Sequence, residues 1–134
     1  MVELPDQEIA KKVMQDLNNN PRYKDNALTW EGELHLEFLP SNGKLEKPLY
    51  LWLDLYHGEC KDAEFVEDSE SKPYEYVISA NEDTWRDLFH DKIDPSRAMM
   101  TGKFKIKGNM AKLMRYPKAA AYILKYLKRY LKEW

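Results

Sequence analysis

The chain has 134 residues, of which 43% are hydrophobic and 33% are charged, and its formal net charge at pH 7 is -2. This length suits one globular domain and is short for two, so we predict a single domain over residues 1–134. No stretch approaches the roughly 20 apolar residues that a membrane-spanning helix requires, which favours a soluble protein.

The cellular compartment is predicted from cysteine usage and from the two ends of the sequence. The single cysteine, Cys60, cannot form an internal disulfide and fits a reducing compartment. The first residues lack the basic and apolar regions of a secretory signal, and residues 132–134 differ from the Ser-Lys-Leu peroxisomal signal. We therefore expect a cytoplasmic protein.

The small net charge conceals an uneven distribution along the chain. Residues 1–96 contain 22 acidic and 10 basic side chains, whereas residues 97–134 contain 11 basic and one acidic. Such asymmetry can mark a surface for anionic partners, either membrane or nucleic acid. Alternatively, the basic segment packs beside the acidic one and the two neutralise each other. The sequence leaves both interpretations open.

The first elements in chain order are a helix, a loop and a strand. Residues 4–17 place Ile9, Val13 and Leu17 on one face, which predicts an amphipathic helix. Three asparagines and Pro21 end it, so residues up to 27 are predicted to be loop. Residues 29–39 alternate between apolar and polar side chains, as in a strand with one buried and one solvent-exposed face. On that face His35 lies among glutamates, where we expect it at the surface.

A second strand, residues 49–56, follows a turn at residues 40–43 and has two apolar or aromatic faces. One face carries four leucines, and the other carries the set Tyr50, Trp52, Asp54 and Tyr56. A central strand covered on both sides explains this pattern, and so does a face that opens onto an internal ligand cavity.

The middle of the chain predicts two more strands and two helices. Residues 60–66 suit an edge strand, residues 67–73 a solvated connection, and residues 74–79 a fourth strand. Because consecutive strands with short connections favour antiparallel neighbours, we expect a largely antiparallel sheet. Helices are predicted over 81–92 and 96–101, the second between Pro95 and Gly102.

The last third of the chain combines one strand with two helical segments. Residues 102–110 read Gly-Lys-Phe-Lys-Ile-Lys-Gly-Asn-Met, whose alternation predicts a half-buried strand over 103–107. Asn109 can then cap a helix that Pro117 interrupts. Residues 117–134 predict the longest amphipathic helix, with a basic face formed by Lys118, Lys125, Lys128, Arg129 and Lys132.

The string at residues 102–110 resembles the signature of the sterol carrier protein 2 family. The order of elements, one helix, four strands, two helices, one strand and a terminal helix, resembles that family's domain over essentially the full length. Asn109 stands where many members have aspartate, and both residues cap helices. The resemblance implies an α+β fold with a five-stranded, largely antiparallel sheet, covering helices and an apolar cavity.

The same resemblance implies noncatalytic binding of an apolar lipid, either a fatty acyl chain, a sterol-like or an isoprenoid lipid, with intermembrane transfer and without a cofactor. We predict ligand contacts from Trp52, Met99, Met100, Phe104, Met110, Leu113 and Met114. Methionine suits variable apolar shapes, although ordinary core packing explains the same residues. The basic face of the last helix is predicted to contact an anionic membrane surface transiently.

Other functions receive less support from the sequence. We find no metal-ligand spacing among the three histidines, no nucleophile elbow and no phosphate-binding loop, so we do not expect an enzyme. His57 and Cys60 flank Gly58 and are expected to point apart. Nucleic-acid binding is not expected, because the basic residues match no recognised motif.

The alternative function is a protein-interaction module with a vestigial cavity. Its docking surface would be the aromatic side chains of the last helix, Tyr122, Tyr126, Tyr130 and Trp134. The sequence does not predict the oligomeric state.

Overall fold

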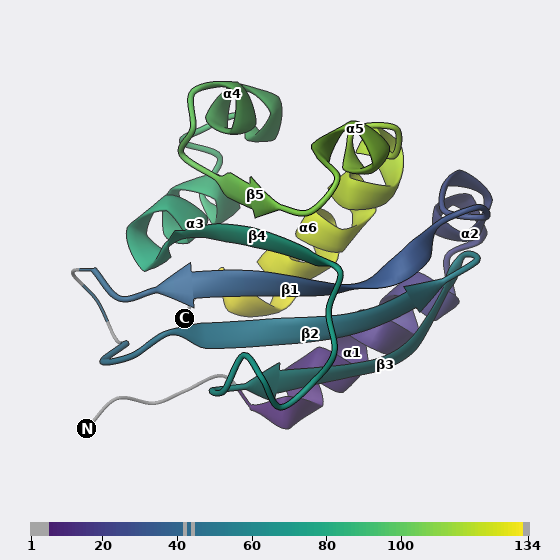
Figure 1. The fold of residues 1–134 in the computed structure, drawn as a ribbon, viewed down its shortest axis with the longest axis horizontal. Coiled ribbons are helices and arrows are strands. Elements are labelled where there is room, and N and C mark those ends of the chain that lie inside the picture. The colour runs from purple at the N-terminus through teal and green to yellow at the C-terminus, as the bar shows by residue number, and fades with distance from the viewer. Residues whose placement is uncertain (1–5, 42, 44, 133–134) are drawn as a thin grey trace.

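Five strands form one sheet in the computed structural model, which describes residues 6–41, 43 and 45–132. The strands are β1 (Glu31–Leu39), β2 (Leu49–Tyr56), β3 (Glu59–Val66), β4 (Tyr76–Asn81) and β5 (Lys105–Lys107). Their order across the sheet is β3-β2-β1-β4-β5 (Figure 1). Three neighbouring pairs of these strands are antiparallel, and the pair of β1 and β4 is parallel. The predicted five-stranded, largely antiparallel α+β fold is therefore confirmed.

The strand beside β4 differs from the one that the sequence predicts. We expected consecutive strands to be neighbours, but β3 stays at the sheet edge and the chain crosses the sheet to place β4 beside β1 (Figure 1). A return across one face of the sheet makes a parallel pair, which a tight hairpin cannot do. The edge position of β3 is confirmed.

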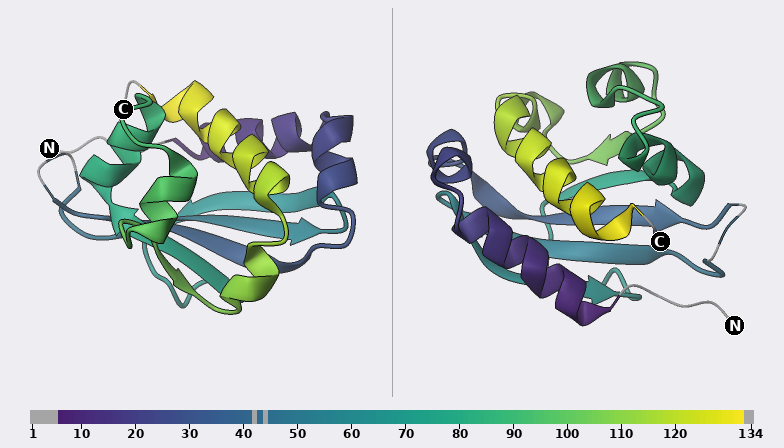
Figure 2. Two further views of the ribbon diagram at one scale, coloured as in Figure 1. Left: turned by 90° about the horizontal axis from the view of Figure 1, so that it is seen from above. Right: turned by 180° about the vertical axis from the view of Figure 1, so that it is seen from behind.

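Within the described residues, six helices lie on one face of the sheet or at its ends (Figure 2). They are α1 (Gln7–Asn18), α2 (Pro21–Asn26), α3 (Glu82–Phe89), α4 (Pro95–Met100), α5 (Met110–Leu113) and α6 (Pro117–Leu131). The helix α2 corrects the predicted loop. Asn20 caps it by accepting from the backbone N–H of Arg22 and Tyr23, and Pro21 stands at its first turn, where a missing N–H costs nothing.

The strand β5 is shorter than predicted, because the backbone N–H groups of residues 103 and 104 donate to Ala98 of α4 instead of pairing with β4. The backbone N–H of Lys103 donates to the Ala98 carbonyl at 2.9 Å. After β5, Gly108 has a φ of 109°, and a Cβ there would lie 2.7 Å from the Glu75 carbonyl. The second glycine of the signature is therefore required by backbone conformation and by close packing against the start of β4.

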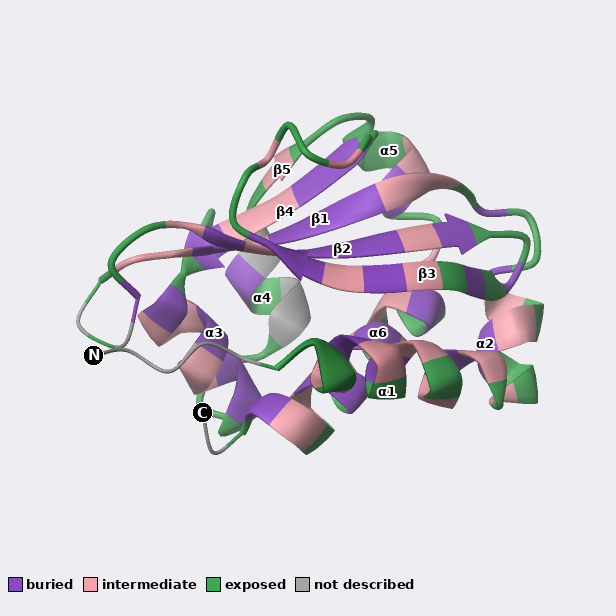
Figure 3. Ribbon diagram, turned by 90° about the horizontal axis from the view of Figure 1, so that it is seen from below, coloured by how far each residue is buried: buried purple, intermediate pink, exposed green. Residues whose placement is uncertain are grey.

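The core lies between the sheet and the helices (Figure 3). Alternate residues of β1 and β2, including Leu36, Leu51 and Leu53, are buried on the side that faces the helices. Leu17 of α1 and Leu127 of α6 are fully buried against them. One helix-covered face explains the alternation read along β1, because successive side chains of a strand point to opposite faces.

The outer face of the sheet is covered in part by the connection from β3 to β4, and this corrects the expectation for His35. That side chain is 0% exposed, with the Tyr74 ring 4.4 Å away and the Tyr50 ring 5.3 Å away. Trp52 Nε1 donates to the Pro73 carbonyl at 2.9 Å, and this hydrogen bond holds the β3–β4 connection against the sheet. Neither ring nitrogen of His35 has a hydrogen-bond partner among the described residues.

Burial lowers the pKa of His35 from its ordinary value of 6.5, and the nearby Glu37 carboxylate opposes this shift. The unfolded chain therefore takes up a proton more readily than the folded one. Stability linked to this group is present above about pH 6.5 and is lost as the pH falls toward the folded-state pKa.

We expect the urea midpoint of the wild-type protein to fall more steeply between about pH 7 and pH 5 than that of His35→Leu. The exposed His90 provides a control, because His90→Gln should keep the wild-type slope. Denaturation followed by far-UV circular dichroism at each pH measures both. Equal slopes for His35→Leu and wild type would contradict the desolvation of His35.

Candidate functional site

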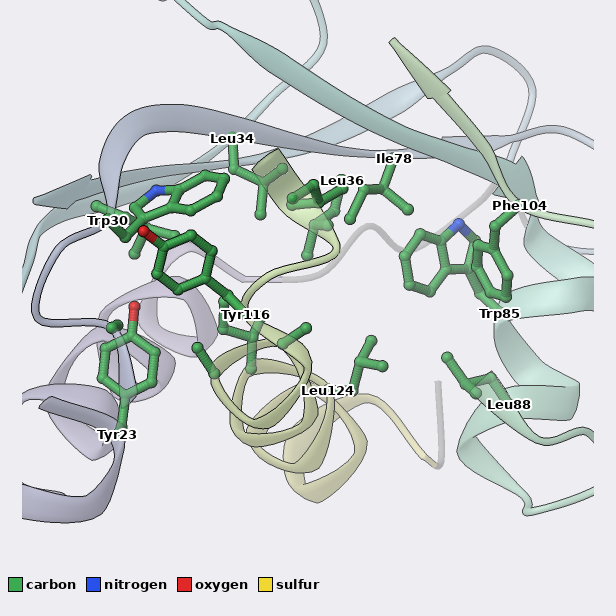
Figure 4. A pocket seen from close by; sticks show the side chains of 16 residues that line it. Tyr23, Trp30, Leu34, Leu36, Ile78, Trp85, Leu88, Phe104, Tyr116 and Leu124 are labelled. Carbon is green, nitrogen blue, oxygen red and sulfur yellow. The ribbon is translucent and has the colours of Figure 1, made fainter. Parts of the chain in front are cut away.

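An apolar pocket lies between the helix-covered face of the sheet and the helices (Figure 4). The sheet contributes Leu34, Leu36, Leu55 and Ile78; the region of α2 contributes Tyr23, Ala27 and Trp30; α3 contributes Trp85 and Leu88; the C-terminal part contributes Phe104, Leu113, Tyr116, Ala119, Ala120, Ile123 and Leu124. All are aliphatic or aromatic. The cavity volume is about 70 Å³, room for about two water molecules at about 30 Å³ each.

The position of the pocket follows from small residues at the start of α6. Ala119 and Ala120 line the pocket from the first turn of that helix, and Ile123 and Leu124 follow one turn later. Residues four apart lie on the same side of a helix, so these four form one stripe. Alanine leaves a gap where a larger side chain would reach the strands, and the gap becomes the cavity.

Two tryptophans border the pocket at opposite ends. Trp30 packs against Tyr116 at 5.1 Å between ring centroids, and its Nε1 donates to the Gly32 carbonyl at 3.0 Å. Trp85 packs against Phe104 at 4.9 Å, and its Nε1 donates to the Glu37 carbonyl at 2.9 Å. Both indole N–H groups are thus paired with strand backbone. The pocket meets ring carbon, which favours a hydrocarbon over a hydrogen-bonding ligand.

The two tyrosines that line the pocket do not add charge to its apolar lining. The Tyr116 hydroxyl lies 2.9 Å from Thr29 Oγ1 and forms a hydrogen bond there. Tyr23 is 1% exposed, and burial raises the pKa of its phenol, which stays neutral at physiological pH. The lining therefore offers no charge to a ligand.

The pocket opens on the side where its lining residues keep partial exposure. These are Ile78, Tyr116, Ala120 and Leu124. Ile78 lies in the interior strand β4, where it pairs with Leu36 of β1 and Ile106 of β5. Its exposed surface therefore faces away from the sheet, on the side of the helices. The mouth therefore lies between Ile78 and the start of α6 (Figure 4). The strand β5 pairs with β4 beside Ile78 and runs between α4 and α5 (Figure 1).

Of the six predicted ligand contacts whose side chains the structure describes, two line this pocket, Phe104 and Leu113. Met110 and Met114 are each 52% exposed, because the single turn of α5 points Leu113 inward and those two outward. Met100 is 84% exposed. The side chain of Met99 lies outside the described residues.

Trp52 lies on the opposite face of the sheet from the pocket. It pairs with His35 rather than with the inward-facing Leu34, and the Lys72 ammonium lies 4.9 Å from its ring centroid. The two-sided apolar pattern of β2 therefore reflects a covered outer face. The sequence does not distinguish this arrangement from a cavity wall, because both bury the same side chains.

Several lining residues were not predicted as site residues: Trp30, Trp85, Tyr116, Ile123 and Leu124. One sequence signal points to the last two. Residues 119–121 are three consecutive alanines at the start of an otherwise bulky amphipathic helix. A gap in side-chain volume on a core-facing stripe is the local pattern that a cavity requires.

The predicted membrane-contact residues of α6 divide into two groups. Lys128 Nζ lies 2.5 Å from Asp91 Oδ2, and Arg129 Nη1 lies 3.0 Å from Asp16 Oδ2. The ammonium of Lys128 lowers the pKa of the Asp91 carboxyl. The remaining three, Lys118, Lys125 and Lys132, are exposed. Part of the basic C-terminal segment thus neutralises the acidic segment of the same chain.

Most of the aromatic residues predicted for the alternative interaction surface form contacts within the chain itself. Tyr126 is 6% exposed, and its hydroxyl accepts from Asn20 Nδ2 at 2.8 Å. The Tyr130 hydroxyl donates to Asp16 Oδ2 at 2.6 Å. Tyr122 is half-buried against the core, and Trp134 lies outside the described residues.

The described residues include no group of three His, Cys, Asp or Glu side chains that could hold a metal ion. His57 Nε2 lies 2.6 Å from Glu31 Oε1, whereas the Cys60 thiol donates to the Asp62 carbonyl at 3.3 Å. The two side chains therefore have separate partners. Burial raises the pKa of Cys60 to about 12, which keeps the thiol protonated and unreactive.

The fold and the pocket define a class of protein: an α+β domain that encloses apolar space between a mixed sheet and its covering helices. The chain belongs to the SCP-2 sterol transfer family, whose model matches residues 10–120. This confirms the resemblance seen in residues 102–110. None of the helices in the described ranges is long and apolar enough to cross a membrane.

Two solved structures are similar over nearly the whole chain. The crystal structure of sterol carrier protein 2 is 32% identical, has a TM-score of 0.84, and is matched over 96% of this chain and 99% of that one. The solution structure of a conserved hypothetical protein from Thermus thermophilus is 31% identical, with a TM-score of 0.81 and coverage of 96% and 90%.

A curated relative is similar over a shorter region. Non-specific lipid-transfer protein-like 1 of Caenorhabditis elegans is 37% identical over 54 residues, which is 40% of this chain. The matched region spans 46% of that relative's length.

The raised pKa of Cys60 predicts slow reaction with a disulfide reagent such as Ellman's reagent. At pH 8 a thiol with a pKa of about 12 is ionised in about one molecule in ten thousand. We expect labelling of the native protein to be at least about a hundredfold slower than labelling in urea, where the ordinary thiol pKa returns. Fast native labelling would show that Cys60 is accessible and activated.

Proposed function

We propose that this protein binds the apolar part of a lipid in the pocket beneath α6 and carries it between membranes, without catalysis and without a cofactor. The observation that supports the proposal is the wholly apolar lining, in which both indole N–H groups and the Tyr116 hydroxyl are paired with other protein atoms. Similarity to proteins named for sterol and lipid transfer supports it as well.

The size of the cavity bears on how a lipid would enter. A volume of about 70 Å³ is below the roughly 300–1,000 Å³ of ordinary ligand pockets. Uptake therefore requires the pocket to widen, and we expect the short helices α4 and α5, of six and four residues, to move. Ten enclosed methylenes would contribute roughly 8 kcal/mol, from which the costs of widening and association are subtracted.

The lining also bears on the class of lipid. The lining carries no charge, and its two indole N–H groups and the Tyr116 hydroxyl are already paired, so it offers little to a polar headgroup. The headgroup therefore stays at the mouth while the chain or ring system enters. Fatty acyl, sterol-like and isoprenoid lipids all meet this requirement. Native mass spectrometry of the purified protein, followed by organic extraction, would identify which class it holds. The single-domain organisation and the cytoplasmic location stay predictions from the sequence.

We expect Leu113→Trp to weaken binding of the fluorescent fatty acid cis-parinaric acid by about tenfold or more, because the larger ring fills the cavity. Leu113 is 8% exposed and lines the pocket, whereas Ala111 is exposed on the same helix. The matched control Ala111→Trp should bind like wild type. Fluorescence titration measures affinity, and far-UV circular dichroism checks the fold.

Two outcomes would contradict the proposal. If the wild-type protein takes up neither cis-parinaric acid nor a fluorescent sterol, it is not a lipid carrier. If Leu113→Trp lowers the free energy of unfolding by more than about 3 kcal/mol, the site is a dense core rather than a pocket, since overpacking a dense core carries that cost.

A further inference from the structure

An exposed apolar surface borders the mouth of the pocket. Three methionines have large exposed fractions, Met100 at 84% and Met110 and Met114 at 52% each. Met100 ends α4, Met110 begins α5 and Met114 directly follows it, and β5 runs between these two helices (Figure 1). We call this region, with the strand β5 between the two helices, the mouth edge. Three large apolar side chains kept in solvent on neighbouring elements favour a contact surface.

The mouth edge also carries unneutralised positive charge. Residues 97–118 contain seven basic side chains and no acidic one. Lys103, Lys105, Lys107 and Arg115 are exposed, and no acidic side chain in the described ranges forms an ion pair with them. The C-terminal half of α6 differs, because Lys128 and Arg129 there have acidic partners.

Methionine and lysine together fit the chemistry of one partner. The flexible thioether side chain enters irregular apolar layers, and lysine binds anionic headgroups while its methylenes remain in the apolar layer. Anionic lipid attracts basic residues only within about a Debye length of the surface. The combination of exposed methionine and unpaired lysine therefore matches the interface of an anionic bilayer.

We propose that the mouth edge docks on an anionic lipid membrane, with Met100, Met110 and Met114 in the interfacial layer and the lysines of residues 103–107 against the headgroups. This inference rests on the proposed lipid-carrying function, because docking in this orientation places the mouth of the pocket against the bilayer. It assigns membrane contact to α4, β5 and α5 rather than to the basic face of α6 predicted from the sequence.

The test compares two variants that remove the same charge from different surfaces. Lys103→Gln/Lys105→Gln changes the mouth edge, and Lys125→Gln/Lys132→Gln changes α6; all four side chains are exposed. Sedimentation with phosphatidylcholine vesicles, with and without phosphatidylserine, measures binding at low salt. We expect the first variant to bind anionic vesicles about tenfold more weakly than wild type and the second to bind within about twofold of it.

Two further measurements separate the charge from the methionines. Raising salt from about 0.05 M to 0.5 M should reduce wild-type binding, because screening shortens the range of the lysine charges. Met100→Gln/Met110→Gln should lower vesicle binding while keeping that salt dependence, since the charges remain. Circular dichroism of every variant checks that the fold is retained.

The outcomes distinguish docking from lipid binding itself. The proposed docking surface is wrong, and the carrier function stands, if the wild-type protein binds cis-parinaric acid but does not bind anionic vesicles at low salt. The same conclusion follows if the α6 variant loses vesicle binding and the mouth-edge variant keeps it. If wild type binds anionic vesicles through the mouth edge but takes up no lipid, the docking surface stands and the carrier function fails.

Discussion

The space beneath α6 depends on two indole rings that hold the layers of the molecule apart. Trp30 and Trp85 each donate an N–H to the backbone of β1, near its beginning and its end. Their rings then pack against Tyr116 and Phe104, which belong to the C-terminal part of the chain. Because each ring is large, rigid and satisfied in its only polar atom, each fixes one end of the pocket, Trp30 against Tyr116 and Trp85 against Phe104.

The uneven charge of the sequence has two physical outcomes in the folded chain. Near the end of α6, basic side chains pair with acidic ones from much earlier in the sequence, as in the contact of Lys128 with Asp91. Around β5, the lysines have no such partner among the described residues. The neutralising interpretation therefore holds near the end of α6, whereas the lysines around β5 are the ones that the proposed membrane contact uses.

The crossing of the chain from β3 to β4 determines what the outer face of the sheet can be. It covers His35 and Trp52, which would otherwise leave an aromatic patch in water. It also brings β4 beside β1, which positions Ile78 over the middle of the pocket. One connection thus protects the face away from the ligand and supplies a wall on the face toward it.

The sequence by itself determined the features that depend on neighbours along the chain. Alternation in β1 and β2, the amphipathic spacing of α1 and α6, and the glycine-bounded turn at Gly108 are local patterns, and each was predicted at nearly its observed position. The family signature belongs to the same category, because it is a contiguous string. The helix α2 also depends on neighbouring residues in the sequence. The asparagine run and Pro21, however, predict the end of the first helix rather than the cap and start of a second one.

Only the tertiary structure decided which apolar side chains enclose the pocket. Trp52 and Trp85 are alike in sequence terms, yet one lies beneath the β3–β4 connection and the other borders the cavity. Likewise Leu113 points inward and Met114 outward, which depends on how the single turn of α5 sits on the sheet. Burial depends on contacts between residues distant in sequence, and a local pattern of hydrophobicity records that a side chain is buried but not what covers it.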